Sequence, residues 1–226
     1  MIPKIIHFCW FGKKDKPSLV NKYIESWRNI MPDFQLLEWN EYNFDVAKYR
    51  YTKEAYKAKK YAFVSDVARL YALYDIGGVY FDTDILLLKS MDNLLTNKSF
   101  VGYESDNLLG TGVMAAEKNT QWIYDFYQLY QGISFINWNG RQSLMPNTVR
   151  LQRSNILKDC KFDGKEDVLE NGLHIYPFDY FCAKDYNSSN IQTTNNTYCI
   201  HDYSSSWIGE KDIDLRKRII NLYCKF

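Results

Sequence analysis

The sequence predicts an α/β fold with a mostly parallel central sheet and helices on both faces. Over residues 5–39 an apolar run rich in β-formers, a helical pattern and a second β-rich run follow one another. This is the order of a strand–helix–strand unit with parallel strands. A longer helical pattern over residues 53–74 then leads into another apolar run, and such runs are typical of strands buried on both faces. With 226 residues, we expect a single domain over residues 1–226.

The first three expected elements lie before residue 40. Residues 5–10 are short, apolar and rich in β-forming side chains, so they are expected to form a buried strand. A helix is expected from Ser18 onward, because Leu19, Tyr23 and Trp27 recur near helical spacing. A Met-Pro-Asp break ends it, and residues 34–39 are expected to form the second strand.

The middle of the chain contains the longest helical pattern, over residues 53–74. Asp66 and Arg69 fall on one face of that helix. The Gly-Gly pair at 77–78 supplies a left-handed stop. Residues 79–88 then read as one buried strand, interrupted only by two aspartates.

The rest of the chain is expected to be more irregular. Its predicted elements are short strands at 100–103, 112–116 and 198–201, a helix around 122–130, a polar loop region at 159–196 and an amphipathic helix at 212–226.

The composition excludes several classes of protein. The 28 basic and 27 acidic residues nearly cancel, so no nucleic-acid partner is expected. No run approaches 18 uncharged apolar residues, and the N-terminus is a poor signal peptide. We therefore expect a soluble, cytoplasmic protein.

The pair Asp82 and Asp84 is the strongest chemical signal. At positions i and i+2 of an expected strand, both carboxylates lie on the same face. Carboxylates this close repel each other, and a divalent cation such as Mg²⁺ or Mn²⁺ removes that conflict because it prefers oxygen ligands. The alternative is that one aspartate caps a turn while the other is solvated. Spacing alone leaves both interpretations open.

A longer ordered string surrounds this pair. Ser65-Asp66, then Arg69, then Gly-Gly-Val-Tyr-Phe-Asp-Thr-Asp over residues 77–84, resembles the glycosyltransferase sugar-binding region that contains the DXD motif. That family includes yeast mannosyltransferases, bacterial capsular-polysaccharide transferases and, more distantly, the glucosylating clostridial toxins. Residues 2–12 and 201–207 are similar to the family's first strand and C-terminal segment.

The resemblance implies a GT-A-type nucleotide-binding fold and a hexosyltransferase activity. It implies a nucleotide-sugar donor, either a UDP- or a GDP-sugar, a glycan or lipid-linked glycan acceptor, and dependence on Mn²⁺ or Mg²⁺. It also implies retention of the anomeric configuration and a place in bacterial surface-polysaccharide synthesis.

The resemblance also implies roles for individual residues. Asp82 and Asp84 are expected to bind the metal, with His201 or Asp202 completing the set of ligands. The expected catalytic group is Asp66, Arg69 and Asp82, although Asp66 and Arg69 alone would also suit a plain helix ion pair. The expected donor contacts are His7, Trp10, Tyr80, Thr83, Ser205 and Trp207.

Two of these assignments have open alternatives. Phe11 is the alternative to Trp10 for stacking on the base. His7 has the alternative of a satisfied core residue, which a lone histidine in an apolar strand more often is.

Two other classes of protein compete with the transferase. An aspartate-dependent phosphatase also uses a DXD motif at a strand end, usually on the first strand of the chain. A carbohydrate-binding module would use the many aromatic residues, 19 Tyr, 13 Phe and 6 Trp, as stacking platforms.

The C-terminal pattern also leaves two interpretations open. A basic amphipathic helix at 212–226 either packs on the sheet or makes a peripheral contact with the inner face of the membrane.

Overall fold

Five of the seven strands in the central sheet run in the same direction. The computed structural model describes residues 1–184 and 190–203. The order across the sheet is β2-β1-β3-β6-β5-β8-β7. The pairs β2–β1, β1–β3 and β5–β8 are parallel, while β3–β6, β6–β5 and β8–β7 are antiparallel, so only β6 and β7 oppose the rest. The sheet strands are β1 Ile5–Cys9, β2 Gln35–Trp39, β3 Gly78–Phe81, β5 Ser99–Ser105, β6 Leu108–Ala116, β7 Asp167–Val168 and β8 Leu173–Tyr176.

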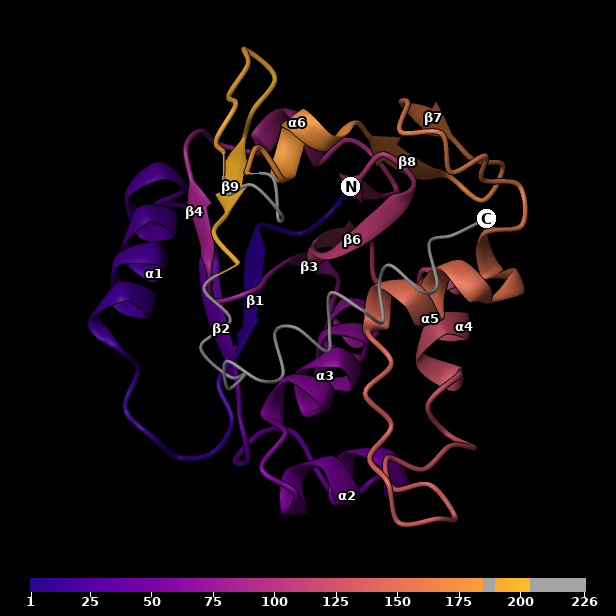
Figure 1. The fold of residues 1–226 in the computed structure, drawn as a ribbon. Coiled ribbons are helices and arrows are strands. Elements are labelled where there is room, and N and C mark those ends of the chain that lie inside the picture. The colour runs from indigo at the N-terminus through magenta and orange to yellow at the C-terminus, as the bar shows by residue number, and fades with distance from the viewer. Residues whose placement is uncertain (185–189, 204–226) are drawn as a thin grey trace.

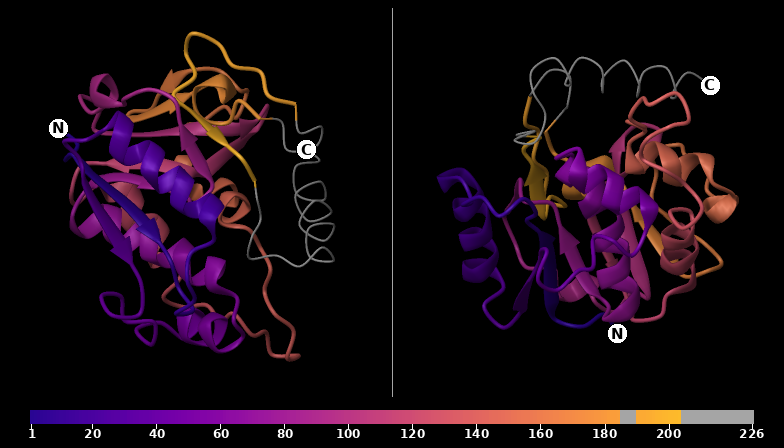
Figure 2. Two further views of the ribbon diagram at one scale, coloured as in Figure 1. Left: turned by 90° about the vertical axis from the view of Figure 1, so that its left-hand side faces the viewer. Right: turned by 90° about the horizontal axis from the view of Figure 1, so that it is seen from below.

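Helices cover both faces of this sheet, which confirms the predicted α/β architecture (Figures 1 and 2). The helices α2, α3, α4 and α5 contribute to the core on one face, whereas α1, α6 and a small β4–β9 ribbon contribute to the core on the other. The bounds are α1 Ser18–Ile30, α2 Arg50–Lys57, α3 Tyr61–Asp75, α4 Gln121–Gln128, α5 Asn147–Arg153, α6 Phe178–Phe181, β4 Ile85–Leu87 and β9 Cys199–His201, with 3₁₀ turns at Asp92–Leu94 and Asn155–Leu157.

Alternation along the strands assigns their side chains to the two cores. In β3, Val79 and Phe81 pack with α1, whereas Tyr80 packs on the side of α3. In α1 the buried stripe contains Tyr23 and Trp27, as expected, but Leu19 is 44% exposed.

The connections from β1 mark an edge of the sheet where ligands commonly bind in α/β proteins. The chain leaves β1 for β2 on one side and returns to β3 on the other, and both neighbours are parallel to β1. In open α/β sheets such a switch in strand order opens a crevice at the carboxyl ends of the strands. Trp10 follows β1 and Asp82 follows β3, so both lie at this edge.

The prediction of one helix over residues 53–74 is wrong, because two helices occupy this region. The amide of Lys60 donates to the carbonyl of Ala55, and that of Lys59 donates to the carbonyl of Tyr56. With Lys59 at φ 58°, these bonds form a Schellman motif that ends α2. The chain then restarts as α3.

The prediction of one strand over residues 79–88 is also wrong. β3 ends at Phe81, and a turn follows in which the amide of Ile85 donates to the carbonyl of Asp82. β4 then leaves the sheet and pairs with β9 beside α1 (Figure 1). Trp27 donates its indole N–H to the carbonyl of Ile85 over 2.8 Å, which fixes the ribbon on the helix.

The prediction of a loop region at 159–196 is wrong in part, because β7, β8 and α6 lie within it. The other later elements agree with the prediction more closely. The expected strands at 100–103 and 112–116 lie within the hairpin β5–β6, the expected helix corresponds to α4, and the last strand is β9. The expected helix at 212–226 lies outside the described residues. None of the helices within residues 1–184 and 190–203 has the length and hydrophobicity that crossing a bilayer needs.

Candidate metal and donor site

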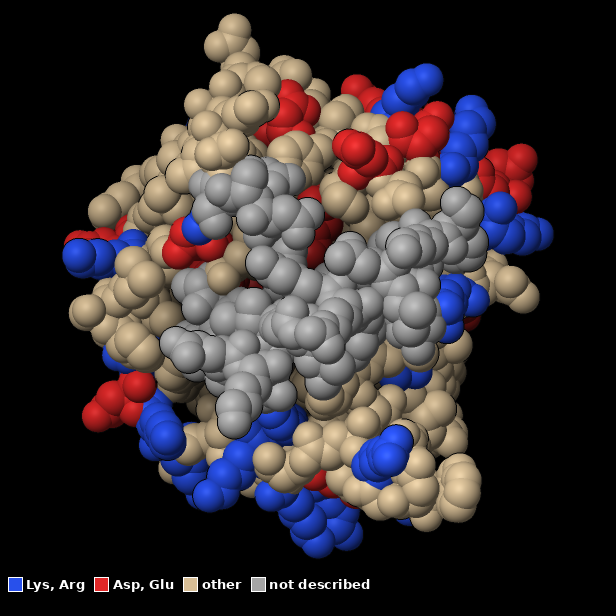
Figure 3. Space-filling model, viewed as in Figure 1, with Lys and Arg blue, Asp and Glu red and all other residues tan. Residues whose placement is uncertain are grey.

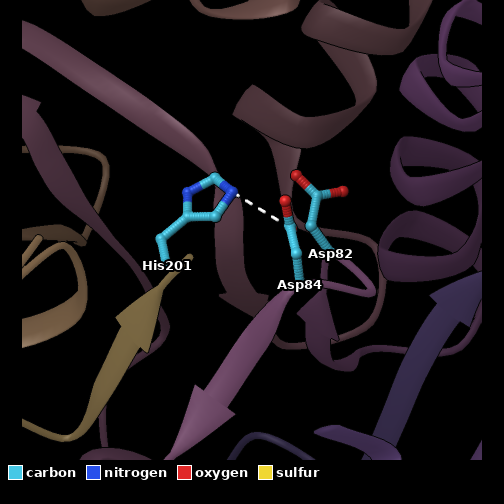
Figure 4. Close-up of side chains that lie close together, drawn as sticks. All are labelled: Asp82, Asp84 and His201. Carbon is cyan, nitrogen blue, oxygen red and sulfur yellow. Dashed lines mark ion pairs between the residues drawn. The ribbon is translucent and has the colours of Figure 1, made fainter. Parts of the chain in front are cut away.

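The turn after β3 brings two carboxylates and an imidazole together. Ligand atoms of Asp82, Asp84 and His201 all lie within 4.8 Å of one another (Figure 4). The three residues come from the turn and from β9, which runs antiparallel to β4 in the register Ile85 to His201. Asp82 and Asp84 are therefore paired by a turn and not by the alternation of a strand, which corrects the reasoning from sequence.

Gly112 provides the space beside this group. A Cβ atom at Gly112 would lie 2.9 Å from Cε1 of His201 and 3.1 Å from Oδ2 of Asp82. The amide of Asp82 donates to the Gly112 carbonyl over 2.8 Å, so the backbone of β6 passes directly behind the carboxylate. The concave space between the three side chains fits a divalent cation, because only glycine leaves it open.

His201 is buried and closely paired. Its Nε2 lies 3.2 Å from Oδ1 of Asp84. Burial disfavours the charged imidazole, but the Asp84 carboxylate outweighs it and holds the pKa of His201 well above its ordinary value. A cation bound between these two side chains would replace that proton as the local positive charge.

Asp202 is held away from the cluster. Lys184 Nζ lies 2.6 Å from its Oδ1, and the hydroxyl of Tyr23 donates to its Oδ2 over 2.6 Å. Its amide donates to the carbonyl of Asp84 over 2.9 Å. Of the two predicted candidates for the third ligand, the structure brings His201 to the carboxylates and gives Asp202 to an ion pair.

Arg69 forms its hydrogen bonds and ion pairs within the protein. Its Nη2 lies 3.0 Å from Oδ1 of Asp66 and 3.2 Å from Oδ1 of Asp82. Its Nη1 donates to the carbonyl of Thr111 over 2.6 Å and to Oδ2 of Asp82 over 3.4 Å, and its Nε donates to the carbonyl of Ser65. A guanidinium has five N–H groups, and here four of them donate hydrogen bonds to the protein, while Nη2 also forms an ion pair with Asp82. Arg69 is therefore a positioning residue for Asp82, and its contact with the donor stays a prediction.

The environment of Arg69 keeps it charged. The side chain is 4% exposed, and burial opposes its charge, but the carboxylate of Asp82 raises its pKa further above the ordinary value. Its guanidinium carbon lies 4.6 Å from the centroid of the Tyr80 ring. The Tyr80 hydroxyl in turn donates to Oδ1 of Asp82 over 2.9 Å. Tyr80 is itself buried, so it supports Asp82 from the core side.

The remaining residues predicted to contact the donor differ in their solvent exposure. Trp10 is half-buried at the end of β1, with its indole N–H donating to the carbonyl of Lys14, whereas Phe11 is buried against Phe44. Thr83 is half-buried in the turn. Ser205 and Trp207 lie outside the described residues.

His7 is a core residue. It is 0% exposed, its Nε2–H donates to the carbonyl of Gly77 over 2.8 Å, and its Nδ1 accepts the indole N–H of Trp39 over 3.1 Å. Both ring nitrogens are engaged, so the structure supports the alternative assignment as a satisfied core histidine rather than a donor contact.

The match to a protein family agrees with this geometry. Residues 17–101, which include Asp66, Arg69 and the Asp82-Thr83-Asp84 turn, match the family described as "Glycosyltransferase sugar-binding region containing DXD motif". This segment of the chain is similar to a glycosyltransferase sugar-binding region. The resemblance predicted from the sequence is confirmed.

Curated relatives are glycosyltransferases as well. The chain is 27% identical over 223 residues to a protein of Acanthamoeba polyphaga mimivirus described as an uncharacterized glycosyltransferase, covering 92% of this chain and 84% of that protein. It is 31% identical over 121 residues to inositol phosphoceramide mannosyltransferase 1 of Schizosaccharomyces pombe, covering 46% of this chain and 37% of that one.

Two solved structures have a partial likeness to this fold. A glycosyltransferase involved in glycosylating the major capsid of PBCV-1 aligns with a TM-score of 0.47 at 9% identity, covering 96% of this chain and 100% of that one. The galactosyltransferase LgtC aligns with a TM-score of 0.46 at 12% identity, covering 98% and 97%. Both scores are below 0.5, so neither likeness bears on substrate or mechanism.

Several residues of this candidate site carry no clear signal in the sequence. Lys184 and Tyr23 fix Asp202 from segments distant in the chain, and no local pattern singles them out. Gly112 had a partial signal, because it is the first residue of the strand expected at 112–116, and a glycine in a strand can indicate close backbone approach.

Proposed function

We propose that the protein is a metal-dependent, retaining hexosyltransferase that uses a UDP- or GDP-sugar donor and a glycan or lipid-linked glycan acceptor. The observation that supports this most is the group Asp82, Asp84 and His201 at the carboxyl edge of the sheet. It lies beside β1 and β3, at the sheet edge where α/β proteins commonly bind nucleotides, with room left by Gly112. The ligand group, the adjacent sheet edge and the space at Gly112 together suit a nucleoside diphosphate with its cation.

The donor set favours Mn²⁺ over Mg²⁺. Mg²⁺ prefers oxygen ligands in near-ideal octahedral geometry, whereas an imidazole suits the transition metals. The cation would be held by Asp82, Asp84 and His201, and it would supply charge to stabilise the departing nucleoside diphosphate.

The surrounding residues orient this set. Arg69 and Tyr80 together hold both oxygens of Asp82, so that carboxylate presents a fixed lone-pair direction to this edge of the sheet. Trp10, the more accessible of the two candidate aromatics, is proposed to stack on the nucleotide base. Asp66 is proposed to contact the donor sugar.

The GT-A-type assignment, the single-domain organisation and a role in bacterial surface-polysaccharide synthesis in the cytoplasm belong to the same proposal. They rest on the family resemblance. The two competing classes receive less support, because residues 17–101 match a glycosyltransferase family. Phosphatase activity that is independent of nucleotide sugars, or glycan binding without nucleotide and metal, would favour them instead.

Hydrolysis of nucleotide sugars tests the proposal directly. A panel of UDP- and GDP-sugars is screened with Mn²⁺, with Mg²⁺ and with EDTA. Turnover is expected with Mn²⁺ and expected to disappear with EDTA. Asp84→Asn is expected to reduce turnover about 100-fold or more, since a metal supplies several kcal/mol of charge stabilisation.

Asp202→Asn is the matched control for this substitution. The neighbouring carboxylate has the same chemistry but contacts Lys184 and Tyr23 instead of the cluster, so its loss is expected to stay within about tenfold. Undiminished turnover in EDTA, or equal losses in the two variants, would contradict the metal assignment.

A further inference from the structure

A second cavity lies away from the Asp82–Asp84 turn. Its volume is about 420 Å³, within the range of small-molecule sites. It lies between the start of α2, the segment 131–146 and α5, and the amide of Ile136 donates to Oε2 of Glu54 to hold that segment beside α2. Figures 1 and 2 show the segment extending past α2. The lining side chains that matter here are Arg50, Ser134, Asn137, Trp138, Met145 and Arg150.

The cavity lining is basic, although the carboxylate of Glu54 borders it through its bonds to Arg50 and to the amide of Ile136. The lining contains two arginines and, within the described part of the chain, neither an aspartate nor a glutamate. Arg50 pairs with Glu54 over 2.7 Å, but in residues 1–184 and 190–203 no ion pair is made by Arg150. Figure 3 shows basic side chains gathered on the same end of the molecule. The cavity therefore suits a negatively charged ligand.

Arg150 also carries a donor without an acceptor. Its Nε is buried and has no hydrogen-bond partner among the described residues. Its guanidinium carbon lies 5.0 Å and 5.7 Å from the ring centroids of Tyr130 and Tyr51, which hold it in place. A planar guanidinium matches the two oxygens of a phosphate or carboxylate, and because the Nε is itself buried, the Nη groups are the donors that a ligand would meet.

Trp138 adds a flat apolar surface at the rim. Its side chain is 98% exposed, and it lies at the tip of a small hairpin closed by the Ile136–Gln142 bridge and by the amide of Asn137 donating to the carbonyl of Arg141. Because its ring is not buried, Trp138 contributes little hydrophobic stabilisation to the fold. Aromatic rings of this kind pack against the apolar face of a sugar.

The cavity lining is connected to the core beneath the Asp66–Arg69 pair. Tyr51 and Tyr130, over which Arg150 lies, are buried, and after burial the charge of Asp66 raises the pKa of both. The helix of Arg150, α5, packs on β6, which carries Thr111 and Gly112.

We propose that this cavity binds an anionic sugar unit of the acceptor, with Arg150 on its phosphate or carboxylate and Trp138 against its ring. The identity of the ligand as acceptor rests on the proposed transferase function, whereas the binding of an anionic sugar does not. Phosphate and carboxylate share the chemistry of two charged oxygens, and separate probes distinguish them.

The test measures binding without donor or metal. Saturation-transfer NMR compares glucose 6-phosphate, glucuronate and glucose. At least one anionic sugar is expected to bind, with glucose about tenfold weaker or more. Arg150→Gln and Trp138→Ala are each expected to weaken that binding about tenfold, whereas Arg141→Gln, on the same hairpin but outside the lining, is expected to leave it unchanged.

The outcomes separate this inference from the proposed function. Arg150 packs on two buried rings, so if Arg150→Gln does not fold, Arg50→Gln and the exposed Trp138→Ala decide the result. Equal binding of glucose and glucose 6-phosphate, or binding that none of these variants alters, would overturn the assignment. Donor hydrolysis with Mn²⁺ is measured on the same samples. Hydrolysis without sugar binding overturns this inference alone, and sugar binding without hydrolysis supports the cavity while contradicting the transferase.

Discussion

At the scale of single residues, Gly112 determines whether the carboxylate cluster has room for an ion. Its backbone is not in the left-handed region, so conformational freedom is not what requires glycine there. Space is the requirement, because an added Cβ would lie 2.9 Å from His201 and 3.1 Å from Asp82. Alanine at this position would therefore fill the volume between the proposed ligands.

We predict that Gly112→Ala lowers Mn²⁺ affinity by at least about tenfold, because the neighbouring ligands must shift. Calorimetric titration of Mn²⁺ measures this directly. Gly132→Ala is the matched control, since a Cβ there meets nothing within 4 Å. Unchanged affinity in Gly112→Ala would show that the ion binds elsewhere.

The sequence identified part of this site for physical reasons that can be traced. Asp82 and Asp84 stand out because carboxylates are rare in an apolar run, and family resemblance added His201. The sequence predicted one of the two carboxylate partners of Arg69 and not the other. The bond of Arg69 to Asp66 follows from helical spacing, but its bond to Asp82 depends on how α3 meets the end of β3, which no local pattern encodes.

At the scale of elements, two wrong predictions, one helix over 53–74 and one strand over 79–88, arise because a local pattern does not reveal tertiary contacts. Residues 79–88 have a continuous apolar pattern because β4 is largely buried, like β3, although β4 packs on α1 in a different sheet. The pattern reports burial and not the partner strand. The break between α2 and α3 was hidden because its left-handed residue is Lys59 instead of the usual glycine.

That position yields an element-scale prediction. Lys59→Gly is expected to stabilise the protein by about 0.5 kcal/mol, because relief of a left-handed lysine slightly exceeds the entropy cost of glycine. Lys53→Gly, at an exposed position inside α2, is expected to destabilise it by about 1 kcal/mol. Urea denaturation of both variants measures whether the free energy of unfolding rises or falls in each. Destabilisation by Lys59→Gly would contradict the Schellman ending of α2.

At the scale of the whole molecule, His7 links the strands beside the candidate site. From β1 it contacts Trp39 of β2 and the carbonyl of Gly77 just before β3. Burial lowers the pKa of His7 from 6.5 to about 4, although the bond to Gly77 partly opposes this. The fold therefore requires a neutral imidazole at its centre, whereas the unfolded chain protonates the same ring near its ordinary pKa.

This difference predicts how global stability depends on pH. Between pH 6.5 and 4 the unfolded chain binds more protons at His7 than the folded one, so the free energy of unfolding falls as pH falls, by about 3 kcal/mol over the window. Urea denaturation at half-unit steps measures the slope. His7→Gln is expected to flatten it, and His174→Gln, which leaves His7 in place, is expected to keep it steep. Carboxylates titrate in the same range in all three proteins, so the difference between variants isolates the imidazole. An equal slope in His7→Gln would mean that the ring is already protonated in the fold, and that its bonds to Trp39 and Gly77 do not hold β1 between β2 and β3 in the way described.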